Sequence, residues 1–370
     1  MKPSARIRVR LKDRSYDVVV VCSRLNTLAA EIRRLRLGTD AVIVTNPTVL
    51  KSHGHARSVH DVLAKGGFAV HIVMVPDTEK SKSMKGLNRL LEAMAGLDRP
   101  GRKIFLVLVG GGVVGDLGGV AAGLYKRGVP FVQIPTTLLA QVDSSIGGKT
   151  AVDLPQGKNL IGLFNQPRLV FVDLAFLRSL PDRQFRSGMA EVAKCGVISD
   201  AVLFRFLENC PLSVLRFSED KLSWVIARAI QVKVSVVERD EKELRGVRTL
   251  LNFGHTVGHA LEAATNYSKN YTHGEAVAIG MCAATDVSLR LKMISSQSAD
   301  RIRHLIRHLG LPTATEKVPL KKIFQAMSYD KKWMIGKNRL VLPTDIGRAV
   351  VVKGVPGAIL RDVVKSLRED

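Results

Sequence analysis

A fully apolar segment that runs directly into glycines constrains the fold of this chain more than any other feature. Residues 104–109 read Ile-Phe-Leu-Val-Leu-Val, and residues 110–119 contain six glycines. A strand without polar alternation is typical of a parallel sheet that is covered on both faces. Glycines at its carboxyl end let the backbone approach a pyrophosphate at the N-terminus of the next helix. The run therefore predicts a nucleotide-binding unit, although close packing of a helix on the sheet would also explain the glycines.

Strand and helix signals alternate through the first half of the chain. Further strands are expected at 41–45, 68–75, 131–135 and 169–173, with a helix at 83–97. After residue 178 the strand patterns nearly vanish, and helices are expected at 201–209, 221–240, 255–265, 274–291 and 299–309. We predict an α/β nucleotide-binding domain with a mostly parallel sheet over 1–178. An all-α C-terminal domain that binds metal and substrate is expected over 179–370.

Composition limits the class of protein. The content of 46% hydrophobic and 24% charged residues is typical of a globular chain of 370 residues. No apolar run reaches the roughly 18 residues that a membrane-spanning helix needs. The basic N-terminal segment leads into no apolar signal sequence, and its alternation of apolar and basic residues is typical of an edge strand. The four cysteines form no CxxC pair, which favours a reducing cytoplasm over a disulfide scaffold.

The formal net charge of +23 is compatible with two classes of partner, nucleic acid or anionic small molecules. The basic residues are dispersed, only 5% of residues are aromatic, and no nucleic-acid-binding motif is present. We therefore expect a small anionic substrate, with neither a nucleic acid nor a membrane as partner.

Three of the nine histidines lie within nineteen residues. His255 and His259 are four residues apart, so on a helix they would share one face, and His273 follows. Imidazole is a common zinc ligand and a general base near neutral pH, although such a pair can also be purely structural. In a separate run of small and apolar residues, Glu191 needs a partner for its charge, and either a metal or Lys194 could serve.

A further polar group lies among small residues and glycines between positions 135 and 162. Asp143, Lys149, Lys158 and Asn159 stand there, where small neighbours could not cover long side chains. Lysines in such a setting suit phosphate or carboxylate binding, although a single lysine is more often a solvated surface group.

Taken in chain order, segments 110–119, 135–153, 157–162, 188–196, 252–262 and 273–281 resemble the 3-dehydroquinate synthases of the sugar phosphate cyclase family. The resemblance covers about residues 42–347. It implies an NAD-binding domain, a zinc-binding helical domain, an active site in the cleft and a homodimer. It also implies conversion of 3-deoxy-D-arabino-heptulosonate 7-phosphate to 3-dehydroquinate and phosphate. The family reaction proceeds by transient oxidation with NAD, phosphate elimination, re-reduction and intramolecular aldol closure.

The resemblance also implies roles for individual residues. The ligands of Zn²⁺, or of Co²⁺ in its place, would be Glu191, His255 and His273, whereas His259 would handle protons near the nicotinamide. Catalytic or anion-binding roles fall on Asp143, Lys149, Asn159, Lys194, Lys233, Arg248, Asn252 and Lys331, and Arg127 would reach the neighbouring subunit's site. NAD contacts fall on Asn46, Asp77, Glu79, Lys82, Gly111, Gly112, Asp116, Thr136, Thr137, Lys149, Lys158, Phe176 and Ser179.

The chain departs from the family pattern at three places. Thr78 replaces a glycine, Leu174 replaces a common threonine, and the stretch 240–248 is one residue longer. Three alternatives stay open: another NAD- and zinc-dependent sugar phosphate cyclase, a zinc polyol dehydrogenase, and a nucleic-acid-binding protein. The set Asn159, Arg248, Asn252 and Lys331 favours a carboxylate-bearing substrate over those of the other cyclases.

Overall fold

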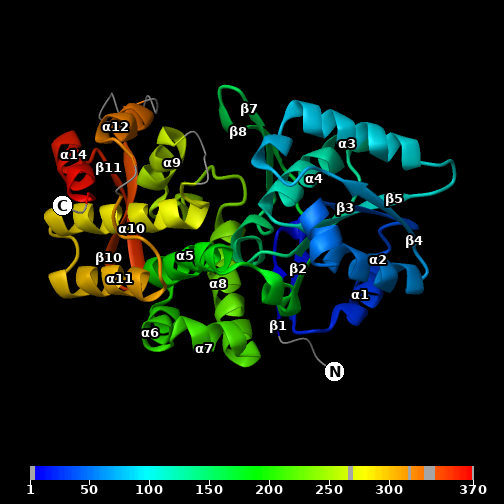
Figure 1. Ribbon diagram of the computed structural model, residues 1–370, viewed down its shortest axis with the longest axis horizontal. Helices are drawn as coiled ribbons and strands as arrows, with labels where there is room; N and C mark the ends of the chain where they lie inside the picture. The colour runs from blue at the N-terminus through cyan, green and yellow to red at the C-terminus, as the bar shows by residue number, and fades with distance from the viewer. Residues whose placement is uncertain (1–4, 266–269, 316–317, 329–337, 369–370) are drawn as a thin grey trace. The chain divides into compact units, whose positions relative to one another are not determined.

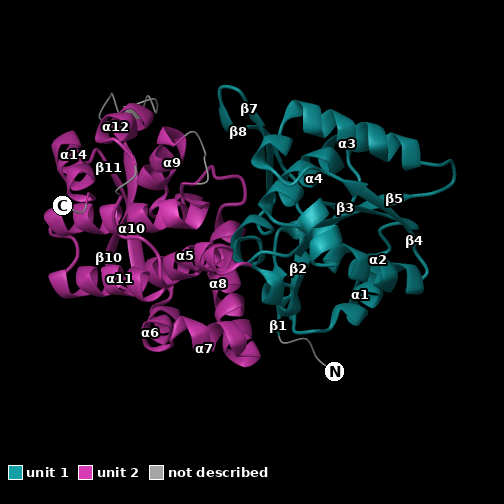
Figure 2. Cartoon of the chain, in the orientation of Figure 1, with its two compact units in different colours: residues 1–180 teal, residues 181–370 magenta. Residues whose placement is uncertain are grey.

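The computed structural model describes residues 5–265, 270–315, 318–328 and 338–368. The chain divides into two compact units, residues 1–180 and 181–370 (Figure 2). Lys331, which the resemblance places at the substrate, lies outside the described residues.

Unit 1 contains a seven-stranded sheet in the order β1-β2-β9-β6-β5-β3-β4 (Figure 1). Its strands are β1 (Ala5–Val9), β2 (Tyr16–Val21), β3 (Asp40–Thr45), β4 (Ala69–Met74), β5 (Ile104–Gly110), β6 (Phe131–Pro135) and β9 (Leu169–Asp173). Every neighbouring pair is parallel except β1 and β2, which are antiparallel. The mostly parallel sheet is therefore confirmed, as is the edge strand at the N-terminus.

Both faces of this sheet are buried, which explains the unbroken apolar sequence of β5. On one face Phe105 and Val107 pack into a core with residues of α1 (Leu28–Leu35) and α2 (His55–Lys65). On the other face Leu106 and Leu108 pack with residues of α3 (Met84–Leu97) and α4 (Gly112–Leu124). Alternate residues of one strand thus serve two separate cores.

The glycine run has two structural roles. Gly111 alone separates β5 from α4, so the chain turns tightly into the helix N-terminus. Further along α4, a Cβ on Gly118 would lie 2.3 Å from Leu108 Cδ2, and one on Gly119 would lie 2.2 Å from Thr150 Cγ2. Close packing therefore explains Gly118 and Gly119. Only the turn at the start of α4 is left as a candidate binding site for a pyrophosphate.

A two-stranded antiparallel hairpin, β7 (Lys149–Leu154) with β8 (Gly157–Phe164), is added to unit 1. The sequence pattern did not predict these strands. The contact between Thr150 and Gly119 joins the hairpin to α4.

Unit 2 is mainly helical, but it is not the all-α domain that was predicted. It contains α5 (Asp182–Ser199), α6 (Ala201–Asn209), α7 (Leu212–Phe217), α8 (Glu219–Arg239), α9 (His255–Ala264), α10 (His273–Arg290), α11 (Ser296–His308), α12 (Leu320–Ser328) and α14 (Gly357–Ser366). It also contains a hairpin that the pattern did not predict, β10 (Arg339–Asp345) with β11 (Arg348–Lys353). Ser288 of α10 donates a hydrogen bond of 2.5 Å to the Pro343 carbonyl, so this hairpin depends on tertiary packing. Among the described residues, none of the helices is long and apolar enough to cross a membrane.

Candidate functional site

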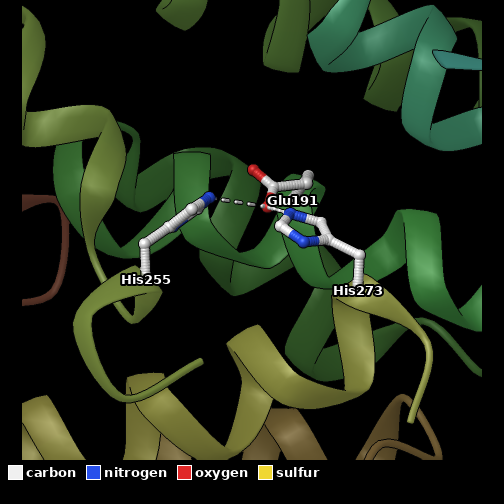
Figure 3. A group of neighbouring side chains, drawn as sticks. All are labelled: Glu191, His255 and His273. Atoms are coloured by element: carbon white, nitrogen blue, oxygen red, sulfur yellow. Dashed lines mark ion pairs between the residues drawn. The ribbon is translucent and has the colours of Figure 1, made fainter. Parts of the chain in front are cut away.

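Three side chains from three helices of unit 2 point toward one another (Figure 3). Glu191 lies within α5, whereas His255 and His273 are the first residues of α9 and α10. One ligand atom from each lies within 4.8 Å of the others. The structure therefore brings together the three residues to which the resemblance assigned the metal, and His259 is not part of this cluster.

Glycines allow these helix ends to converge. Gly254 precedes His255 in the left-handed conformation, at a φ of 80°, which glycine adopts without steric penalty. A Cβ on Gly274 would lie 1.9 Å from the carbonyl oxygen of Ser187. The start of α10 thus lies directly against α5, one turn before Glu191, and this contact places His273 beside the carboxylate.

Hydrogen bonds orient both imidazoles. The Nδ1 atom of His255 lies 3.1 Å from the Phe253 carbonyl oxygen, and Nδ1 of His273 lies 3.3 Å from Glu262 Oε2. Because each Nδ1 faces an acceptor, Nδ1 keeps its proton, and Nε2 is the atom that faces Glu191 and can be offered to a metal. Glu262 was missed at the sequence level, although it stands seven residues after His255 and therefore on the same face of α9.

The distances within the cluster fit a metal better than direct hydrogen bonds. Glu191 Oε1 lies 3.7 Å from Nε2 of His255 and 3.6 Å from Nε2 of His273. These separations exceed a hydrogen bond. They are close to the roughly 3.4 Å between two ligands of a tetrahedral zinc ion. One carboxylate and two neutral imidazoles are also a ligand set that leaves zinc open to a substrate.

The carboxylate of Glu191 is held in its charged form. Its burial would raise its pKa, but Lys194 and the two histidines lower that pKa well below the usual range. Lys194, itself 1% exposed, forms an ion pair with Glu191. Lys194 pairs with Oε2, which leaves Oε1, the oxygen that faces both histidines, to serve as a ligand.

The two histidines differ in their titration. Burial lowers the pKa of His255 to about 3, so its imidazole is neutral at physiological pH. Burial also acts against protonation of His273, but Glu191 and Glu262 outweigh it and raise the pKa of His273 to about 10. A metal ion must therefore displace a proton from His273, and metal affinity is expected to fall as the pH falls.

The other predicted substrate residues of unit 2 lie on neighbouring elements. Lys233 of α8 is buried, and so is Arg248 at the start of η8 (Arg248–Asn252). The Arg248 guanidinium donates a 2.7 Å hydrogen bond to the Glu241 carbonyl. His259 and Asn252 are exposed.

The stretch that is longer than in the family forms turns between α8 and η8. Glu243 adopts a left-handed conformation at a φ of 58°. The carboxylate of Asp240 accepts hydrogen bonds from the backbone N–H groups of Arg245 and Arg248. Asp240 therefore fixes the start of η8.

In unit 1, several predicted NAD residues follow the carboxyl ends of the parallel strands. Asn46 follows β3, Gly111 and Gly112 follow β5, and Thr136 and Thr137 follow β6. This edge is where nucleotides bind in doubly wound sheets. Asn46 Nδ2 donates to Asp77 Oδ1 at 3.0 Å, which joins residues beyond β3 and β4.

Lys82 is the centre of a second polar group in unit 1. Its Nζ donates to Asp116 Oδ2 at 2.7 Å and to Asn159 Oδ1 at 2.6 Å. Lys158 Nζ lies 3.3 Å from Glu79 Oε1. Burial raises the pKa of Asp116 to about 6, while the charge of Lys82 opposes that rise. Hydrogen bonds of Lys82 thus connect two groups of predicted residues. Lys82 and Asp116 were predicted to contact NAD, whereas Asn159 was predicted to contact the substrate.

The turn that contains Phe176 and Ser179, η7 (Leu174–Ser179), is held by a histidine that the sequence did not single out. The Nε2 atom of His55 lies 2.8 Å from Ser179 Oγ, and its ring centroid lies 4.6 Å from that of Phe176. Burial, together with the nearby His53, lowers the pKa of His55 to about 4.

The remaining predicted residues of unit 1 are spread over three elements. Arg127 follows α4, Asp143 lies in η6 (Ala140–Ser144), and Lys149 begins β7. Thr78, where the family has glycine, is extended at a φ of −145°, so its backbone does not require glycine.

The sequence matches family models and proteins of known function along nearly its whole length. The family model described as "3-dehydroquinate synthase N-terminal" matches residues 72–187, and the one described as "3-dehydroquinate synthase C-terminal" matches residues 188–333. The chain is 44% identical over 364 residues to a 3-dehydroquinate synthase of Nostoc punctiforme, covering 98% of this chain and 99% of that protein. The chain belongs to the 3-dehydroquinate synthase family.

Solved structures related to this family carry the same fold. A 2-epi-5-epi-valiolone synthase from Streptomyces hygroscopicus, with NAD⁺ and Zn²⁺ bound, is 30% identical with a TM-score of 0.85; the match covers 97% of this chain and 98% of that one. A 2-deoxy-scyllo-inosose synthase complexed with carbaglucose-6-phosphate, NAD⁺ and Co²⁺ is 26% identical with a TM-score of 0.87, covering 98% and 100%. The chain is thus more similar in sequence to the 3-dehydroquinate synthase than to either of these.

Proposed function

We propose that this protein is a 3-dehydroquinate synthase, a lyase that converts 3-deoxy-D-arabino-heptulosonate 7-phosphate to 3-dehydroquinate and phosphate. It would act in the cytoplasm, in the shikimate pathway to the aromatic amino acids, with NAD and Zn²⁺ as cofactors. Near-full-length similarity to the Nostoc punctiforme enzyme supports this function. The structural observation that most strongly supports this function is the cluster of Glu191, His255 and His273.

The residues of the cluster suit a zinc ion that polarises substrate hydroxyls as a Lewis acid. Glu191, His255 and His273 would hold it, and the ion pair with Lys194 keeps the carboxylate charged. His259 would move a proton, because it stands one turn after His255 on α9 and is exposed. The buried cations Lys194, Lys233 and Arg248 would bind the anionic groups of the substrate and stabilise charge as phosphate leaves.

NAD would supply a hydride acceptor that is regenerated within each turnover. The tight turn at Gly111 and the helix N-terminus of α4 suit its pyrophosphate. Asn46, Asp77, Glu79, Lys82, Asp116 and Lys158 would fix its sugar and phosphate groups. The hydrogen bonds and ion pairs that join these residues within unit 1 support their assignment to one NAD site.

We further propose a homodimer, in which Arg127 reaches the neighbouring active site. The hairpin strand β8 exposes apolar side chains that water solvates poorly: Leu160 is 58% and Phe164 42% exposed, as is Leu124 at 48% on α4. Light scattering should report twice the chain mass, and Leu160→Glu should reduce it to that of the monomer. A parent protein that runs as a monomer at micromolar concentration contradicts this part of the proposal.

The deciding experiment measures phosphate and NADH together. The purified protein with NAD, Zn²⁺ and the heptulosonate phosphate should release phosphate without lasting absorbance at the NADH band. Steady NADH production would point to a polyol dehydrogenase, and turnover of a heptulose or hexose phosphate in its place would point to another cyclase. A chelator and His255→Ala should each abolish phosphate release.

A further inference from the structure

The hairpin of unit 1 contains an irregularity next to the Lys82 group. Val152 pairs with Ile161 and Leu154 pairs with Gly157, so Asp153 alone stands opposite residues 158–160. Such bulges redirect side chains and often lie beside active sites. Here the extra residues on β8 include Lys158 and Asn159, for which the resemblance predicts cofactor and substrate contacts.

Asp153 holds the backbone of this bulge. Its Oδ1 accepts a hydrogen bond of 2.8 Å from the backbone N–H of Asn159. Asn159 is left-handed at a φ of 55°, a conformation that asparagine tolerates better than most residues but that still needs support. The backbone N–H of Asp153 also donates to the Lys82 carbonyl at 2.7 Å, so the bulge is tied to the segment that carries Lys82.

These contacts determine which end of the Asn159 amide faces outward. Lys82 Nζ lies 2.6 Å from Asn159 Oδ1, and an ammonium group can only donate. The amide oxygen therefore faces Lys82, and the Nδ2 group faces away from it. Within the described part of the chain Nδ2 donates no hydrogen bond, and the Asn159 side chain is exposed. Asn159 thus offers the two N–H donors of Nδ2 to a ligand, while its amide oxygen is engaged by Lys82.

We propose that Asp153 is a positioning residue, which fixes Asn159 as a hydrogen-bond donor to an anionic oxygen of the substrate. The inference rests on the proposed function for the identity of the substrate, but the geometry of Asp153, Asn159 and Lys82 is independent of it. The Asp153 carboxylate bonds to Asn159 and would act on the substrate through that residue. Without its carboxylate the left-handed residue relaxes, and the amide donor moves out of place while Lys82 stays paired with Asp116.

The test compares two substitutions in the NAD- and zinc-loaded enzyme. Asp153→Ala removes the acceptor, and we expect kcat/KM for the heptulosonate phosphate to fall about tenfold, mainly through KM. Asp153→Asn keeps an oxygen that can accept from the Asn159 N–H, so it should stay within about twofold of the parent. The Kd for NAD should change less than twofold in both variants, because the Asp153 backbone bond to Lys82 is retained.

A double-mutant cycle separates positioning from general stability. Asn159→Ala should lower kcat/KM at least as much as Asp153→Ala, and adding Asp153→Ala to it should cause no further loss. A merely structural role would instead lower the melting temperature of both Asp153 variants and reduce activity further in the double mutant. Further loss in the double mutant, or unchanged kinetics in Asp153→Ala, overturns the proposal.

A binding measurement keeps this inference distinct from the proposed reaction. Calorimetry with inorganic phosphate and the NAD-loaded protein requires no turnover. Asp153→Ala and Asn159→Ala should each weaken phosphate binding about fivefold, whereas Asp153→Asn should not. Equal phosphate affinity in the parent and all three variants overturns the positioning role, even where the parent enzyme releases phosphate from the heptulosonate phosphate.

Discussion

Removing the carboxylate of Glu262 should weaken metal binding without touching a metal ligand. Glu262 Oε2 lies 3.3 Å from Nδ1 of His273, in a setting where both side chains are largely buried. Loss of such a partner frees the ring to rotate and lowers its basicity, and typically weakens metal affinity about 10- to 100-fold. That range corresponds to about 1.4 to 2.8 kcal/mol of binding free energy. We expect Glu262→Ala to raise the Kd for Zn²⁺ by this factor.

The assay is competition with a chromophoric chelator at pH 7.5, which reads metal affinity directly. Glu275→Gln is the matched control. Glu275 stands near the same end of α10, where it accepts from the Thr272 N–H and from Arg183, but it does not contact His273. The control keeps the capping box, because Gln can also accept from the Thr272 N–H, but it loses the ion pair with Arg183. It should therefore lower stability by less than about 1 kcal/mol and leave zinc affinity unchanged. Zinc affinity in Glu262→Ala within threefold of the parent would refute the assignment of His273 as a ligand oriented by Glu262.

Two further substitutions test packing and titration. Gly274→Ala should destabilise the protein by about 3 kcal/mol or more, because its Cβ would lie 1.9 Å from the Ser187 carbonyl oxygen. The control Gly96→Ala, where the added Cβ meets nothing within 4 Å, should instead stabilise α3 by about 0.5–1 kcal/mol. Urea unfolding measures both, and equal stabilities would contradict the close-contact argument. His55 is a case of linkage: burial lowers its pKa from 6.5 to about 4, so the folded state favours the neutral imidazole. The stability from this group is present above pH 6.5 and is lost as the pH falls toward 4. His55→Gln should therefore lose less stability than the parent over that range in urea melts, and parallel pH profiles would exclude the effect.

The pattern of apolar residues predicted those helices and strands whose buried positions recur regularly along the sequence. Residues 104–109 are apolar throughout because both faces of β5 are covered, and this signal needs no tertiary knowledge. The hairpins behave differently. Strand β8 exposes most of its side chains, and β10 depends on a bond from Ser288, so neither shows a regular pattern of buried positions.

The candidate metal centre shows where spacing fails. His255 and His259 are one helical turn apart, and their ring centroids are 5.2 Å apart, so spacing alone would assign both to the metal. The residue that completes the cluster is instead Glu191, sixty-four residues before His255 in the sequence. What selects it is the contact of Gly274 with Ser187, a backbone approach that leaves no periodic trace. Among the signals in the sequence, only the resemblance of whole motifs points to this set.

The two groups of predicted residues are each assembled within one unit. Glu191, His255 and His273 belong to residues 181–370, and the bonds of Lys82 to Asp116 and Asn159 belong to residues 1–180. Each set is oriented by neighbours from its own unit, Glu262 and Phe253 in one case and Asp153 in the other. We therefore expect metal affinity and amide orientation to vary independently, since each bond named above joins residues of the same unit. Because the proposed reaction needs both, substitutions in the supporting residues should affect different kinetic parameters, and their free-energy effects on binding should add.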